Sequence, residues 1–278
     1  MHKNIAKTEL ICYNLIMQSI YVEAKKFLCD YNVLSNMKDS FTVHTHNLYE
    51  LIFFVRGDAN HVVEDRKYKL SKNDLVLVPP RQYHHIEVCS NGEYERYNIL
   101  FDPEMLEIDK IEGFDKLNDV INLSTNKIAQ EIFAKFNFYY SKLSESAFIE
   151  VAFSLLKELF YNISVFKTES KKECHLTPLL SSALSFINEH LFTIKSIDEV
   201  VNHLYITPSY LFKLFKKELK TSPKKYINDK RITYAQNLIL LGERPTDIAL
   251  KCGFEDYTSF YRQYKKVFNI SPSQENLR

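Results

Sequence analysis

Short apolar runs separated by polar turns fill residues 41 to 101. The runs are rich in Val, Ile, Tyr and Phe, and turns such as Gly57-Asp58 and Lys72-Asn73-Asp74 interrupt them, a pattern that predicts β-strands. The expected strands are residues 50–55, 59–63, 67–70, 75–78, 85–88 and 94–101. Because no helix separates them, these strands predict an antiparallel barrel or sandwich. Residues 1 to about 30 show no strong period, and we expect an arm and a first strand there.

The apolar period lengthens to between three and four residues after Asp102-Pro103. A helix is expected over residues 126–143, and a second helix that opens at Ser144 carries a wide apolar stripe as far as Ile163. The first stripe contains Ile128, Ile132, Phe133, Phe136 and Tyr140. Stripes of this width either pack against their own domain or form part of a dimer seam.

Residues 167–177 read KTESKKECHLT, with three lysines and no periodic apolar face. This composition predicts a linker between a domain formed by residues 1–166 and a domain formed by residues 178–278. Pro178 is expected to begin the first helix of the second domain.

A pattern of about 28 residues is written twice in the C-terminal domain. At an offset of 49 residues, Asp198 aligns with Asp247, Lys216-Lys217 with Lys265-Lys266, and Ser222-Pro223 with Ser271-Pro272. Each copy predicts a helix, a tight turn, a second helix and a Ser-Pro helix start. The sequence therefore predicts two helix-turn-helix units joined by one long helix that begins at Ser222-Pro223 and ends near Gly242.

Composition narrows the class of protein. The chain has 278 residues and a net charge of +1, but residues 180–278 carry +5 and the remainder −4, the asymmetry expected if the C-terminal part meets a polyanion. Five cysteines without a CxxC pair favour reduced thiols, and neither a membrane span nor a signal-peptide core is recognisable. We expect a soluble, cytoplasmic protein.

Four residues of the strand region have the chemistry of a ligand site. His44, His46 and Glu50 are spaced as HxHxxxE, with six residues between Glu50 and Gly57, and His84 follows the turn that begins at Pro79. Histidines two apart on a strand share one face, here the barrel interior. Imidazole and carboxylate groups in this number suit a divalent transition metal. The alternatives are a hydrogen-bonded effector pocket without a metal, a bound metal and metal-dependent catalysis.

This cluster resembles the first motif of the cupin barrel, and His84 resembles the histidine of the second motif. The second motif is degraded, because Asn73 and Arg81 replace expected glycines and Val88 replaces an expected asparagine. The resemblance to cupin-like sensor domains implies an effector pocket without a metal. We therefore expect no cofactor and no catalytic residues. Further candidates for the pocket are Arg56, Arg81, Tyr83 and His85.

The duplicated half predicts contacts with double-stranded DNA. The second helix of each unit presents cations, so Lys213 and Arg262 suit guanine edges, while Lys216 and Lys265 suit phosphates. Phe212 either touches a thymine methyl or packs inward. If the two helices lie about one turn of B-DNA apart, ~34 Å, both enter successive major grooves.

The segment RITYAQNLILLGERPTDIALKCGFEDYTSFYRQYKKVFNISPSQ resembles the signature of the AraC/XylS-type bacterial transcription regulators. The resemblance implies a barrel sensor controlled by a small molecule, helices that pair subunits into a homodimer, and a C-terminal domain of about seven helices. RNA polymerase is a further implied partner. Matching the family's base-contacting faces onto this chain adds Ser209, Phe212, Thr258 and Ser259. Lys220 stands where a glycine commonly ends the first recognition helix.

Three functions therefore compete. The first is a DNA-binding transcription regulator with an effector in its barrel. The second is a metal-dependent cupin enzyme fused to a DNA-binding domain, and the third is a DNA-binding dimer without a ligand.

Overall fold

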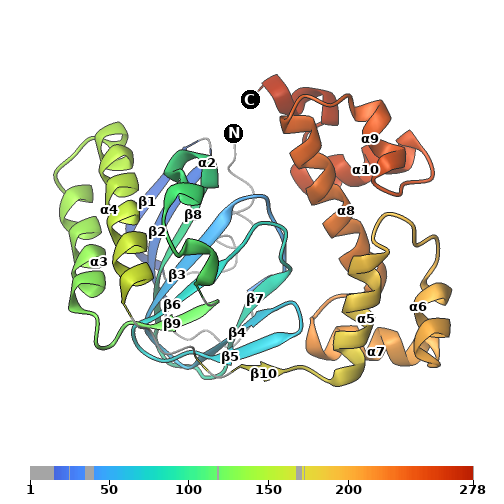
Figure 1. Cartoon of the computed structure of the whole chain (residues 1–278), viewed down its shortest axis with the longest axis horizontal. Helices are drawn as coiled ribbons and strands as arrows, with labels where there is room; N and C mark the ends of the chain where they lie inside the picture. The colour runs from blue at the N-terminus through green and yellow to red at the C-terminus, as the bar shows by residue number, and fades with distance from the viewer. Residues whose placement is uncertain are drawn as a thin grey trace.

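The computed structural model describes residues 16–24, 26–34, 41–117, 119–166, 171 and 173–277. The N-terminal half is built on two antiparallel sheets and the C-terminal half only on helices (Figure 1). The predicted α+β fold class is confirmed. The predictions for residues 1–15 lie outside the described residues. None of the helices in the described part of the chain is long and apolar enough to cross a lipid bilayer.

The larger sheet has six strands and the smaller sheet four, and every strand pair is antiparallel. In spatial order the larger sheet contains β1 (Ile16–Ala24), β2 (Phe27–Leu34), β8 (Tyr94–Phe101), β3 (Tyr49–Arg56), β6 (Asp74–Val78) and β9 (Val120–Asn122). The smaller sheet contains β10 (Cys174–His175), β5 (Arg66–Lys69), β4 (Ala59–Val63) and β7 (His84–Val88). All six strands predicted between residues 50 and 101 are present, within one residue at each end.

The strand prediction was weakest at β2, for a physical reason. Asp30 and Asn32 are buried on the inner face of this strand, where the alternation rule expects apolar residues. The same two positions face Asn98 and Arg96 of β8 across the strand pair. A polar stripe inside the N-terminal half therefore hid the strand from its sequence pattern.

Two apolar cores hold the N-terminal half together. Between the sheets, Ile52, Phe54 and Val76 pack with Val63 and Ile86. On the outer face of the larger sheet lie α3 (Lys127–Tyr140) and α4 (Glu145–Val165), preceded by the short helices α2 (Pro103–Leu106), η1 (Ile108–Lys110) and η2 (Phe114–Lys116) (Figure 1).

The apolar faces of α3 and α4 are therefore buried within the N-terminal half. Phe133 of α3 stacks on Phe53 of β3 at 3.9 Å between ring centroids, and Phe160 of α4 contacts Phe101 of β8. The placement of Ile128 in the buried stripe was wrong, because 50% of its surface is exposed and Ala129 is buried in its place.

The C-terminal half contains seven helical segments in its described part, as expected. They are α5 (Pro178–Glu189), α6 (Ile197–Leu204), α7 (Pro208–Glu218), α8 (Pro223–Leu240), α9 (Pro245–Lys251), α10 (Tyr257–Phe268) and η3 (Pro272–Leu277). One core joins α5, α6 and α7 to the first part of α8, and a second core joins α9 and α10 to the last part of α8. Helix α8 therefore contributes to both cores and connects the two helix-turn-helix units.

The predicted linker is partly structured where it is described. Cys174 and His175 form β10, which pairs with Lys67 and Arg66 at the edge of the smaller sheet. The backbone amide of Leu176 then donates to the carbonyl of Asp65 at 2.8 Å. Residues 167–170 and 172 lie outside the described residues.

Candidate functional site

Helix α7 exposes every residue that was predicted to face DNA. The hydroxyl of Thr207 accepts a hydrogen bond from the backbone amide of Tyr210 and so caps the helix, and Pro208 fills the first turn. One face buries Leu211, Leu214 and Phe215. The exposed residues of the helix include Ser209, Phe212, Lys213 and Lys216.

Phe212 resolves an alternative left open by the sequence. Its side chain is 43% exposed, so it does not pack inward. Lys220, where a glycine is common, adopts φ 55°, the left-handed conformation expected at that position.

Helix α10 repeats this arrangement in the second unit. The carboxylate of Asp256 caps the helix by accepting from the backbone amide of Ser259 at 2.7 Å and from its hydroxyl at 3.0 Å. Phe260 and Tyr264 are buried, and Tyr264 donates its hydroxyl hydrogen to Glu275 of η3. The opposite face exposes Thr258, Arg262 and Lys265, while Ser259 is half-buried at the cap.

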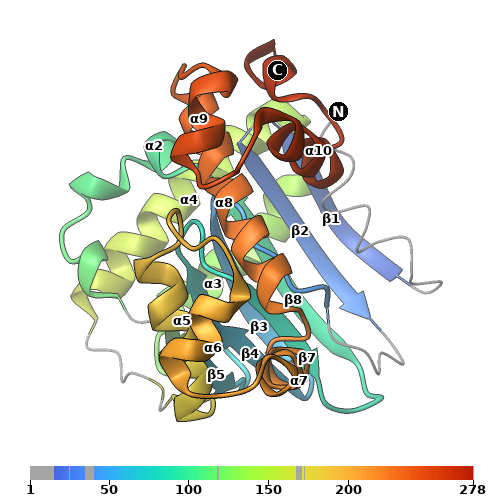
Figure 2. The same cartoon turned by 90° about the vertical axis from the view of Figure 1, so that its right-hand side faces the viewer.

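The two candidate recognition helices lie at opposite ends of α8 (Figure 2). Helix α8 has 18 residues, which at 1.5 Å per residue gives a length of about 27 Å. This length is of the same order as one turn of B-DNA, ~34 Å, which separates two adjacent major grooves. Leu241 lies just after this helix and is 69% exposed.

A buried arginine fixes the second unit to the rest of the C-terminal half. Arg231 of α8 donates to three backbone carbonyls, those of Leu191 at 2.7 Å, Ile194 at 2.6 Å and Gly253 at 2.7 Å. Gly253 has φ +78°, and a Cβ atom there would lie 2.6 Å from the carbonyl oxygen of Phe192. The role of Arg231 is visible only in the three-dimensional structure.

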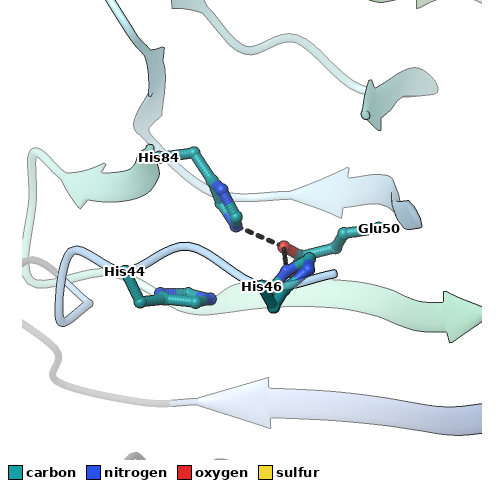
Figure 3. A group of neighbouring side chains, drawn as sticks. All are labelled: His44, His46, Glu50 and His84. Carbon is teal, nitrogen blue, oxygen red and sulfur yellow. Dashed lines mark hydrogen bonds and ion pairs between the residues drawn. The ribbon is translucent and has the colours of Figure 1, made fainter. Parts of the chain in front are cut away.

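The four predicted pocket residues of the N-terminal half come together. One ligand atom from each of His44, His46, Glu50 and His84 lies within 4.8 Å of the others (Figure 3). Glu50 comes from β3 and His84 from β7. The expectation that His44 and His46 lie on a strand was wrong, because residues 41–48 run irregularly and pair only through an isolated bridge between His44 and His84.

Each imidazole of the cluster is oriented by a backbone carbonyl. The Nδ1 atoms of His44, His46 and His84 lie 2.8 to 2.9 Å from the carbonyl oxygens of residues two positions away in sequence. Because a carbonyl oxygen only accepts, each Nδ1 carries the hydrogen. In the neutral tautomer this leaves the lone pair on Nε2, the arrangement that second-shell contacts impose on metal-binding histidines.

The contacts of Glu50 require a positive charge nearby. Its Oε2 atom lies 2.5 Å from Nε2 of His84 and 3.2 Å from Nε2 of His46. Burial opposes ionisation, but the charge of His84 and hydrogen bonds from both rings hold the pKa of the Glu50 carboxyl well below its ordinary value. Burial and the neighbouring His84 lower the pKa of His44 to about 3, so this ring is neutral at pH 7. Either a proton on a ring or a bound cation balances the carboxylate.

The residues present fit a divalent metal ion. Three imidazoles and one carboxylate are the donors that zinc, iron, nickel and manganese accept in proteins. The carbonyl contacts hold the rings in the tautomer that a metal needs. Residues His44, His46, Glu50 and His84 would therefore hold the ion.

A second polar group inside the same half was not recognisable from the sequence pattern. Asp30, Asn32 and Asn98 are at most 8% exposed, and each has a side-chain oxygen without a hydrogen-bond partner among the described residues. Burial raises the pKa of Asp30 to about 6, with Arg96 opposing the shift and Glu50 adding to it. Unsatisfied buried acceptors are costly, and a ligand that carries hydrogen-bond donors would satisfy them. The only sequence signal was an acidic residue among strand-forming residues.

The further pocket candidates lie elsewhere. Arg56 forms ion pairs with Glu93 and Glu95, and His85 faces Glu87. Tyr83 and Arg81 contact the C-terminal half, where Arg81 lies over the ring of Tyr234. These four residues therefore do not join the cluster.

Comparison with known proteins matches both halves of the chain. A family model described as an AraC-like ligand binding domain matches residues 34–131, and one described as a helix-turn-helix domain matches residues 200–276. The HTH-type transcriptional activator RhaR of Escherichia coli is 24% identical over 251 residues, covering 85% of this chain and 87% of RhaR. The probable transcriptional regulator LumQ of Photobacterium leiognathi is 20% identical, covering 87% of this chain and 94% of LumQ.

Among solved structures, ToxT from Vibrio cholerae aligns with 91% of this chain and 98% of its own chain, at 16% identity and a TM-score of 0.39. The two family models match successive halves in the order that the fold shows, and curated relatives align along most of the length. The chain belongs to the AraC/XylS-type family of transcription regulators.

Proposed function

We propose that this chain is a sequence-specific DNA-binding transcription regulator whose N-terminal half binds a small-molecule effector. The observation that carries this proposal is the pair of capped helices α7 and α10, each exposing a cationic face at one end of a shared helix. Such a pair allows one polypeptide to enter two adjacent major grooves. A bacterial regulator that binds DNA acts in the cytoplasm, which is where we place it.

Within this function, the exposed residues of the two helices have different tasks. Lys213 and Arg262 are placed to donate to guanine edges, with Ser209, Phe212, Thr258 and Ser259 beside them. Lys216 and Lys265, one turn further along each helix, are placed to bind phosphates.

The first test separates these tasks on DNA. Arg262→Ala is expected to cost about 1–3 kcal/mol on the cognate operator and to relax one base position. Lys216→Ala is expected to weaken binding to all DNA sequences alike. It should also reduce the slope of the logarithm of affinity against the logarithm of salt concentration by about one unit. Operators selected from genomic DNA and measured by titration at several salt concentrations supply the readout. Lys142→Ala, an exposed lysine in the N-terminal half, is the matched control; equal binding by all three variants would contradict the docking.

The effector site is assigned to the interior of the N-terminal half. His44, His46, Glu50 and His84 form one side, and the unsatisfied oxygens of Asp30, Asn32 and Asn98 extend the polar lining. We further propose that the histidine cluster holds a divalent metal ion, because the ring tautomers and the convergence of three imidazoles on one carboxylate both favour a cation there. A metal would supply a positive charge to which an effector oxygen can bind.

Metal binding is tested by stoichiometry and stability. Purified protein is expected to bind one Zn²⁺ per chain, and a free concentration about 100-fold above Kd stabilises by ~2.7 kcal/mol, or about 5–10 °C in Tm. Glu50→Gln and His46→Ala are expected to abolish both effects. His175→Ala removes an exposed histidine outside the cluster and serves as the control. A melting temperature that responds to Zn²⁺ equally in all variants would place the ion elsewhere.

Two partners are finer proposals within the same function. We propose a homodimer formed through α3 and α4, supported by exposed apolar side chains that include Phe138, Tyr161 and Val165. RNA polymerase is proposed as the partner through which DNA binding changes transcription.

A further inference from the structure

The two halves of the chain share a polar and apolar interface centred on α8. Asn47 donates its side-chain amide to the carbonyl of Thr233 at 2.8 Å and to Oε1 of Gln236 at 3.0 Å. Tyr83 is 1% exposed, and its hydroxyl lies 3.0 Å from a carboxylate oxygen of Asp229 and 3.2 Å from the hydroxyl of Thr221. The interface is therefore specific, because it pairs buried polar groups of the two halves.

Glu64 links the polar contacts of this interface into one network. Its carboxylate accepts from the backbone amide of Tyr83 at 2.9 Å, from the hydroxyl of Tyr226, and from Nζ of Lys230 at 2.7 Å. The side chains of Glu64 and Lys230 are both 12% exposed. Separating the halves breaks a largely buried ion pair, although water then solvates both charges.

The residues that hold α8 are next in sequence to residues of the histidine cluster. Asn47 directly follows His46, and Tyr83 directly precedes His84. The two segments are also joined to each other, because the backbones of His44 and His84 exchange hydrogen bonds of 3.1 and 3.0 Å. A change in the spacing of the cluster must therefore move both interface residues.

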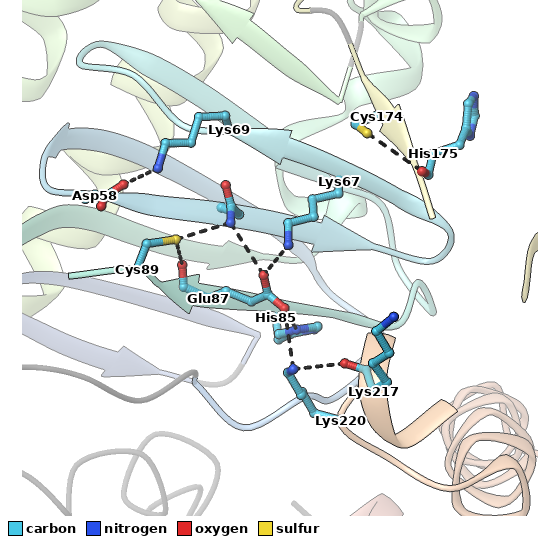
Figure 4. A network of polar contacts seen from close by, with 11 residues as sticks. Asp58, Lys67, Lys69, His85, Glu87, Cys89, Cys174, His175, Lys217 and Lys220 are labelled. Carbon is cyan, nitrogen blue, oxygen red and sulfur yellow. Dashed lines mark hydrogen bonds and ion pairs between the residues drawn. The ribbon is translucent and has the colours of Figure 1, made fainter. Parts of the chain in front are cut away.

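The same segment borders the first recognition helix. Phe41, Thr42 and Val43 line a hollow of about 720 Å³ together with Phe212 and other residues of α7 and its C-terminal turn, among them Lys213, Lys216 and Lys220. Lys220 also approaches Glu87 of β7 at 4.0 Å (Figure 4). In the docked arrangement, part of the N-terminal half therefore stands beside the face of α7 that DNA would contact.

We propose that a divalent metal ion in the His44, His46, Glu50 and His84 cluster fixes the two segments that carry Asn47 and Tyr83, and so holds the DNA-binding half docked on the sensor half. Loss of the ion loosens both segments and releases α8 and α7. This inference rests on the proposed metal site. The ion shifts the equilibrium only if it binds the docked arrangement more tightly than the released arrangement.

A single fluorophore reports docking, because the chain contains no tryptophan. Tyr234→Trp places an indole under Arg81 at the interface, where the tyrosine ring now lies 5.6 Å from the guanidinium. Zn²⁺ alone is the probe, compared with chelator-treated protein of full length. Removing Zn²⁺ is expected to raise the acrylamide quenching constant about two-fold, as a shift from docked to released molecules requires.

Variants in the same background separate coupling from metal binding. Tyr83→Phe keeps the ring but removes its bonds to Thr221 and Asp229, so it is expected to bind Zn²⁺ normally and to lose the quenching response. Glu50→Gln is expected to lose both. Tyr21→Phe, which removes a hydroxyl that donates to Glu23 within the sensor half, is expected to retain both.

Each outcome decides between the proposals. Zn²⁺ binding without any change in quenching would overturn the coupling and leave the metal site standing. Absence of Zn²⁺ binding would overturn the metal site and this inference together. Neither result affects operator binding by Arg262 and Lys216, which tests the regulator function separately.

Discussion

Replacing Arg231 with methionine is expected to destabilise the C-terminal half by about 3–5 kcal/mol and to abolish specific DNA binding. The substitution keeps the apolar stem but leaves the carbonyls of Leu191, Ile194 and Gly253 without their donor. The arginine is 7% exposed, so water replaces few of these bonds. The loss should appear as a shifted urea transition of the helical half, with operator binding lost in parallel.

Arg244→Met is the matched control for this experiment. Its side chain is 80% exposed and forms a surface ion pair with Asp247, and such pairs contribute about 0–1 kcal/mol. If Arg231→Met unfolded at the same urea concentration as Arg244→Met, the three carbonyl bonds would not be what joins the two helix-turn-helix units.

Asp30→Asn is expected to stabilise the N-terminal half at pH 7 by roughly 1–3 kcal/mol, although it removes a charged group. Burial raises the pKa of Asp30 to about 6, above the ordinary value of about 3.9. The folded state therefore binds a proton more tightly than the unfolded state. The cost of the carboxylate is fully present above pH 6 and disappears as the pH falls towards 4.

Urea unfolding of both proteins at pH 7 and at pH 4 measures this effect. The difference between wild type and Asp30→Asn should be large at pH 7 and small at pH 4. Asp58→Asn removes an exposed carboxylate that pairs with Lys69 and should change stability by less than about 0.5 kcal/mol at either pH. A benefit of Asp30→Asn that grew towards pH 4 would contradict the assigned cause.

An effector response weakened by the same substitution would show that function maintains this unfavourable carboxylate. Buried groups with perturbed pKa values are common at ligand sites. Asp30→Asn would then gain stability at neutral pH and lose sensitivity to the effector.

The elements that the sequence predicted well are those specified by local chemistry. The start at Ser222-Pro223 and the end near Gly242 place α8 within about two residues, and the caps Thr207 and Asp256 show the same local chemistry at the starts of α7 and α10. The repeat added independent support, because the same signals occur twice at one offset. The ends of a helix depend on residues three or four positions away, and these residues can be identified from the sequence alone.

The parts that escaped prediction depend on distant residues. β2 was obscured by the inward-facing Asp30 and Asn32, and no local pattern links Asn47 to Gln236, 189 residues away. The four residues of the histidine cluster do come together, as predicted. The expected backbone was wrong, because His44 and His46 lie on an irregular segment and not on a strand. Long-range packing set these features, and a single sequence does not reveal it.

Strand β10 determines how far the two halves can separate. The chain is paired to the smaller sheet as far as His175, and from Thr177 onward it is bonded to Glu218 of the helical half at 2.9 and 3.0 Å. Only Leu176 lies between these anchors. A tether this short keeps a released DNA-binding half at an effective concentration of at least the millimolar range relative to its docking surface. Docking contacts that would be negligible between separate molecules therefore suffice here, and a small change in their strength moves many molecules between the two arrangements.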